Sequence, residues 1–99
     1  MTERHVEFHL EAVSEARAAL EWYQARSELA ASAFIAELDV AVVHIRETPS
    51  QWPTFLAGTR RYLLQRFPYS VIYREVEGAV QVIAVAHGRR RPGYWKGRA

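Results

Sequence analysis

The apolar positions in the first half of the chain follow two different periods, one after the other. Residues 4–9 alternate polar and apolar side chains, which is typical of a short, half-buried strand. From Leu10 onward, apolar residues recur every three or four positions, as they do on one face of a helix. The residues predicted to form that face are Val13, Ala16, Leu20 and Tyr23. We therefore expect a strand followed directly by a helix of about five turns.

A second helix is predicted to follow with little interruption. Ser27 is a good N-cap residue, and Pro49 disfavours helical geometry at Thr48, so these residues mark the two ends of the helix. The apolar residues between them step by four, four, three and four positions. They are Ala30, Phe34, Leu38, Ala41 and Ile45. Two helices that are each apolar on one side predict an antiparallel hairpin lying on a sheet.

Residues that favour strands dominate the second half of the chain. Residues 49–59 contain prolines and a glycine, and they predict an irregular connection held in place by Trp52 and Phe55. Three strands are expected after this connection, over residues 60–66, 70–76 and 80–86. Glu77 and Gly78 supply the turn between the last two of them.

The fold expected from these elements is an α+β two-layer sandwich in the order β-α-α-β-β-β. Residues 80–86 are almost continuously apolar, so this strand is predicted at the centre of the sheet, covered on both faces. The predicted core residues are Leu20, Tyr23, Phe34, Leu38, Ile45, Ile72, Tyr73 and Ile83.

Composition limits the class of protein. A chain of 99 residues with 49% apolar residues predicts a single domain, here residues 1–99, with its own core. The absence of cysteine excludes disulfide scaffolds, thiolate nucleophiles and Cys-type zinc sites. No apolar run approaches the roughly 20 residues of a membrane span, and no signal-peptide pattern is present, so we expect a soluble, cytoplasmic protein without a membrane partner.

Charge is distributed unevenly between the two halves. Residues 1–50 carry four arginines against nine acidic residues, a balance of −5. Residues 51–99 carry eight arginines and one lysine against two acidic residues, a balance of +7. A biased genome would explain arginine in place of lysine, but it would not explain the clustering. The basic half is therefore the better place to search for a functional surface.

Most catalytic motifs are absent, which leaves a basic and aromatic segment as the candidate site. The chain has no Gly-rich phosphate loop, no Gly-x-Ser-x-Gly and no pair of carboxylates suited to acid–base chemistry. His5 and His9 lie on a predicted strand, about 13 Å apart, and are expected to be surface residues of an edge strand. We therefore expect no metal site and no cofactor.

Basic residues interleaved with aromatic ones suit a single-stranded nucleic acid, with guanidinium groups on phosphates and rings stacked on bases. Cleavage of RNA without a metal would need a base, an acid and cations at the scissile phosphate, and His87 has a suitable intrinsic pKa. The alternative is a solvated basic tail whose Tyr94 and Trp95 pack back onto the sheet. Composition does not decide between these two interpretations.

The ordered set of motifs resembles the RelE/ParE superfamily of toxins from type II toxin–antitoxin modules, closest to the ParE or plasmid-stabilisation branch. The resemblance covers nearly the whole chain, from Phe8 to Arg98. It depends on three segments in sequence: Arg66-Phe67-Pro68-Tyr69, the strand Val71-Ile72-Tyr73, and His87-Gly88-Arg89-Arg90. Each segment alone would be weak, and their combination is specific.

The resemblance implies a helical hairpin packed on a small, mainly antiparallel sheet, with the first strand beside the last. It also implies a cognate antitoxin as partner. The superfamily divides by target: ParE-like members poison DNA gyrase, whereas RelE-like members are ribosome-dependent mRNA endonucleases. We favour the gyrase interpretation and keep the endonuclease, and a degenerate non-toxic member, as alternatives.

Roles follow from the resemblance position by position. In the endonuclease interpretation, Arg61 or Arg66 would hold phosphate, Arg90 would stabilise developing charge, His87 would be the acid or base, and Tyr94 would stack on a base. In either interpretation, further residues are expected to contact the target or the antitoxin. These are Arg60, Arg66, Arg89, Arg91, Trp95 and Lys96. The antitoxin is expected to lay an acidic and apolar segment across this basic half.

Overall fold

The computed structural model describes residues 4–98 and confirms the predicted order of elements. A short strand precedes the two helices, and three strands follow them. The elements are β1 (Val6–Phe8), α1 (Leu10–Gln24), α2 (Glu28–Glu47), a 3₁₀ turn (Leu56–Gly58), β2 (Arg60–Leu63), β3 (Tyr69–Val76) and β4 (Ala79–His87).

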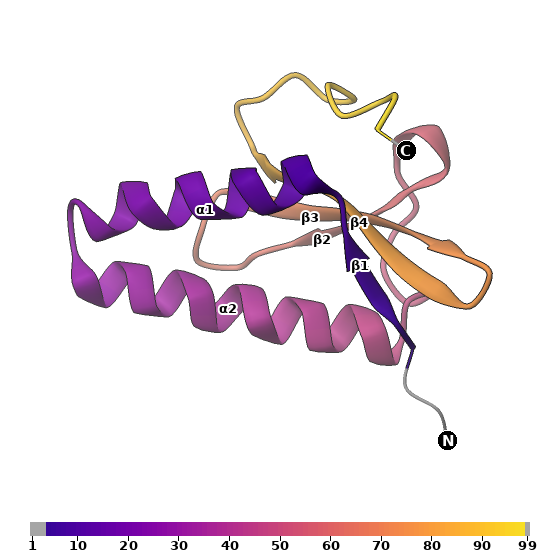
Figure 1. Cartoon of the computed structure of the whole chain (residues 1–99), viewed down its shortest axis with the longest axis horizontal. Helices are drawn as coiled ribbons and strands as arrows, with labels where there is room; N and C mark the ends of the chain where they lie inside the picture. The colour runs from indigo at the N-terminus through magenta and orange to yellow at the C-terminus, as the bar shows by residue number, and fades with distance from the viewer. Residues whose placement is uncertain (1–3, 99) are drawn as a thin grey trace.

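The four strands form one mixed sheet in the order β1-β4-β3-β2. β1 lies beside β4, as the resemblance implied. The two strands run parallel, and the other two pairings are antiparallel. The α1–α2 hairpin lies along one face of this sheet (Figure 1). Glu77 and Gly78 both have positive φ, 51° and 81°, which is the backbone of a tight hairpin turn and explains the glycine there. The predicted α+β sandwich is therefore confirmed.

The buried face of α1 is rotated by one residue from the predicted one. Ala12 and Ala19 are buried, whereas Val13, predicted to face the core, has 37% of its surface exposed. Small alanine side chains allow the helix to approach β4 closely, and the larger residues turn outward as a result. His9 is also placed differently from the prediction: its Nδ1 accepts the Glu11 N–H at 3.1 Å, so it is the N-cap of α1 and not an edge-strand residue.

α2 follows the prediction closely. The Ser27 hydroxyl accepts the Ala30 N–H at 3.1 Å, and the helix ends one residue before Thr48. Of the eight predicted core residues, five are buried. They are Phe34, Ile45, Ile72, Tyr73 and Ile83. Leu20, Tyr23 and Leu38 are only partly buried and pack against the edge of the core.

β2 is shorter than predicted because its continuation binds to α2. The Glu37 carboxylate on α2 accepts the backbone N–H groups of Gln65 and Arg66. It also pairs with the Arg66 side chain at 3.3 Å. The strand therefore ends at Leu63 instead of residue 66.

The second face of the sheet is covered by the C-terminal segment, residues 88–98. Trp95 has only 2% of its surface exposed and packs against Ile72, Ile83 and Ala84. The helices cover one face of β4 and this segment covers the other, which confirms the predicted central strand. No helix within residues 4–98 has the length and apolar character needed to cross a bilayer.

Candidate target-binding surface

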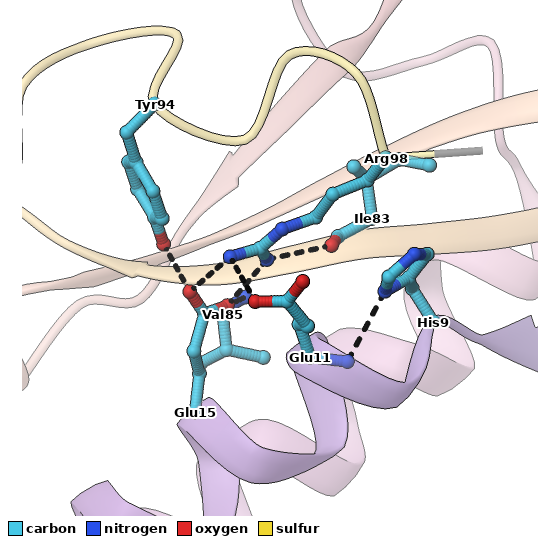
Figure 2. A network of polar contacts seen from close by, with 7 residues as sticks. All are labelled: His9, Glu11, Glu15, Ile83, Val85, Tyr94 and Arg98. Carbon is cyan, nitrogen blue, oxygen red and sulfur yellow. Dashed lines mark hydrogen bonds and ion pairs between the residues drawn. The ribbon is translucent and has the colours of Figure 1, made fainter.

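The C-terminal segment is attached to α1 by a half-buried carboxylate (Figure 2). Arg98 donates two hydrogen bonds to Glu15, Nη1 to Oε1 and Nη2 to Oε2, each at 3.0 Å. The Tyr94 hydroxyl donates to Glu15 Oε2 at 2.6 Å, and the Val85 N–H donates to Oε1 at 3.0 Å. Arg98 also donates to the carbonyl oxygen of Ile83 at 3.1 Å. Glu15 thereby connects α1, β4 and the C-terminal segment.

These contacts shift the proton affinities of the network. Burial by itself would raise the pKa of Glu15, but hydrogen bonds from Arg98, Tyr94 and Val85 outweigh it and lower that pKa below its usual 4.5. Burial and the hydrogen bond to Glu15 raise the pKa of Tyr94 far above 10.0. The hydrogen bond to Glu15 also raises the pKa of Arg98. The network therefore consists of a carboxylate, a phenol and a guanidinium at neutral pH.

Several predicted site residues gather around the segment held by this network. Arg61, His87, Arg90 and Arg91 line one small recess of about 70 Å³ between β2, the end of β4 and the C-terminal segment. The Arg61 guanidinium lies 4.3 Å from the centre of the Phe55 ring, and the Arg90 guanidinium lies 3.7 Å from the Tyr94 ring. Arg89 and Lys96 are exposed on the same segment. We call Arg61, Arg89, Arg90, Arg91 and Lys96 the basic tail surface.

His87 is partly buried where β4 ends. Its Nδ1 accepts the Arg89 N–H at 3.0 Å, and its ring meets the Tyr69 ring edge-on at 5.0 Å between centres. The ring is therefore held by one hydrogen bond and one aromatic contact.

Three of the predicted contact residues lie apart from this surface. Arg60 faces the helix side of the sheet and donates to the Trp52 carbonyl oxygen at 2.6 Å, because neighbouring residues of a strand point to opposite faces. Arg66 pairs with Glu37 on α2. Trp95 is a core residue, and its 2% exposure leaves no surface for a partner. Tyr94 and Trp95 both pack against the sheet.

Two features were missed by reasoning from the sequence. Glu15 has the spacing of a solvated helix charge, and no local signal marks it as the partner of Arg98. The second feature is a larger open groove of about 380 Å³ between α1 and the end of β4. Its small Ala18 and Ala19, followed by Trp22, are a sequence signal that could have suggested it.

Metal coordination has no visible site: within residues 4–98, no three His, Asp or Glu side chains come together in a way that could hold an ion.

Comparison with known proteins gives two findings. Residues 6–92 match the family described as "ParE toxin of type II toxin-antitoxin system, parDE". The structure resembles a chain of the "Chromosomal ParDE TA system from P. aeruginosa", with a TM-score of 0.75 and 17% identity, over 86% of this chain and 96% of that one. At this identity the structural likeness shows the fold, and no curated protein matches the sequence. Because the family match spans most of the chain, this protein belongs to the ParE toxin family of type II toxin–antitoxin systems.

Proposed function

We propose that this toxin stops growth by binding DNA gyrase through the basic tail surface, and that a cognate antitoxin neutralises it by covering that surface. Membership of the ParE family makes a protein target the first expectation. The observation that carries the choice of target is the state of the aromatic side chains beside the arginines.

An RNA-cleaving site of the expected kind would need a free ring to stack on a base. Arg90 covers the Tyr94 ring at 3.7 Å, and the Tyr94 hydroxyl is bound to Glu15. Trp95 is buried. Neither ring is therefore free to stack on a base. This supports a surface that uses its exposed cations to contact a folded protein over a surface that binds unstacked nucleotides.

The charge of this surface also supports an acidic antitoxin. The surface holds five cations within one strand and the C-terminal segment, and the Glu15 carboxylate beside that segment already binds Arg98. Charges at the rim of an interface mainly set the association rate and its salt dependence. Raising the salt concentration should therefore slow association with the cognate antitoxin well before it abolishes binding. An association rate that does not change with ionic strength would contradict this placement.

The target is tested by inducing the toxin without its antitoxin. We expect gyrase-dependent supercoiling to fail while transcripts on translating ribosomes remain intact. Arg90→Ala should weaken growth inhibition strongly, because only a few residues dominate a protein interface. Arg17→Ala, which removes an exposed arginine from the middle of α1, is the matched control and should leave toxicity unchanged.

His87→Ala separates the two targets. For a gyrase-binding surface, His87 positions the end of β4, so its loss should weaken toxicity only in part. For an endonuclease, loss of the acid–base group should reduce cleavage by about 10²–10⁴-fold without unfolding the protein. Ribosome-dependent cuts that vanish in His87→Ala would overturn the gyrase proposal. A folded chain with neither effect would indicate a member of the family that has lost its toxicity.

A further inference from the structure

The outer edge of β4 is paired over only part of its length. β1 pairs with β4 from Val80 to Val82, and after Phe8 the chain turns away into α1. β4 continues to His87, so no strand within residues 4–98 lies beside its last residues on that side.

The polar groups on this open edge can be assigned from their partners. The Val85 N–H donates to Glu15 and thus points away from β3. Groups two residues apart on a strand point to the same side, so the His87 backbone faces the same edge. The His87 carbonyl oxygen accepts the Arg90 N–H at 3.0 Å. The Val85 carbonyl oxygen and the His87 N–H lie between these two occupied groups.

The groove of about 380 Å³ lies along this edge. Ala18 and Ala19 of α1 leave room beside Val85 and His87, and Trp22 borders the groove with 52% of its surface exposed. Arg90 lines the same groove. The groove thus combines an open backbone edge, an apolar wall and a cation.

The two open backbone groups suit a parallel strand better than an antiparallel one. In a parallel pair, a residue of one strand donates its N–H to the carbonyl oxygen of a residue on the neighbouring strand. Its own carbonyl oxygen accepts the N–H of the residue two positions further along that neighbouring strand. Val85 and His87 offer that spacing. An antiparallel partner would use two different residues for these two bonds, and the second backbone group of each would face a β4 group that is already bound.

We propose that this groove binds an extended segment of the antitoxin parallel to β4, with an apolar side chain against Ala18 and Trp22 and acidic residues following on its C-terminal side. The order follows from direction, because a segment parallel to β4 leaves the groove towards Arg89, Arg90 and Arg91. The proposal rests on the proposed function in taking the antitoxin as the occupant, and it adds where the segment lies, which way it runs and what sequence it carries.

A library of short displayed peptides, selected on the full chain, tests the groove and the direction without the antitoxin. We expect the enriched peptides to contain an apolar residue followed, and not preceded, by Asp or Glu. Ala18→Trp fills the groove at an exposed position and should weaken their binding by about tenfold or more. Ala36→Trp places the same side chain on an exposed position of α2 and is the matched control.

Hydrogen exchange provides an independent readout, since a bound parallel strand should slow exchange of the His87 amide. Enriched peptides without the apolar-to-acidic order would overturn the proposal, as would binding that survives Ala18→Trp. Ala36 lines a second groove, of about 300 Å³, between α2 and the end of β2. Loss of binding in Ala36→Trp alone would assign the peptides to that second groove and would also overturn the proposal. Tight binding of the antitoxin itself to Ala18→Trp would refute this inference and leave the proposed toxin function standing.

Discussion

Removal of Arg98 should be among the most destabilising changes outside the apolar core. Arg98→Ala deletes two hydrogen bonds to Glu15 and one to the Ile83 carbonyl oxygen. The side chains of Arg98 and Glu15 are only 11% and 16% exposed, so the Glu15 carboxylate would remain without its counterion in a poorly solvated place. Breaking a buried pair in this way costs about 3–5 kcal/mol, and partial solvation places this one near the lower end.

The loss is large relative to the stability of a chain of this size. A small domain is stable by about 5–15 kcal/mol, and each kcal/mol corresponds to roughly 4–8 °C in melting temperature. We therefore expect Arg98→Ala to lower the melting temperature by about 12–24 °C. Arg91→Ala, at an exposed position of the same segment, should change stability by less than about 0.5 kcal/mol and serves as the control.

A double-mutant cycle measures the pair itself. We expect urea unfolding of Glu15→Gln, Arg98→Ala and the double variant to show the double variant less destabilised than the sum of the single ones. Each single variant leaves one partner of the pair uncompensated, whereas the double variant removes both. Additive effects, or an Arg98→Ala chain as stable as the Arg91→Ala control, would refute the assignment of Glu15 as the residue that holds the C-terminal segment.

Three further predictions concern pH and the core. The lowered pKa of Glu15 means that its contribution to stability is present above pH 4.5 and is lost as pH falls below it, so acid unfolding of Glu15→Gln should depend less on pH. Phe34→Ala, at a fully buried ring, should cost about 3–5 kcal/mol in urea unfolding, and Leu38→Ala should cost less because Leu38 is only partly buried. Tyr73→Phe should cost about 1–3 kcal/mol, because the Tyr73 hydroxyl donates to the buried Pro49 carbonyl oxygen at 2.6 Å, and equal stability of the two chains would contradict that contact.

The order of elements could be predicted because it depends on local signals. Ser27 caps α2, Pro49 limits it, and the Glu77-Gly78 pair allows the positive φ of the hairpin turn. Each of these acts within a few residues of its own position. The apolar run of β4 likewise predicted a strand covered on both faces, since only a buried strand can be apolar in every direction.

Other properties were set by contacts between residues far apart in the sequence. The end of β2 depends on Glu37 of α2, and the exposure of Val13 depends on how closely α1 approaches β4. The residues that make these two contacts lie far along the chain from the residues that the contacts affect. Pattern alone therefore misplaced that strand end by three residues and rotated the buried face of α1 by one.

The candidate site was predictable in composition but not in geometry. Clustering of arginines in residues 51–99 indicated the half of the chain that carries the basic tail surface. Only the tertiary structure decided which face of the sheet Arg60 takes, that Trp95 is core, and that Glu15 joins Arg98 across 83 positions of the chain. Such a pair has no periodic signal, because its two members belong to elements that meet only when the sheet is assembled. The same physical reason applies to the open edge of β4. That edge is open because β1 is shorter than β4, and the sequence of β4 gives no signal of where β1 ends.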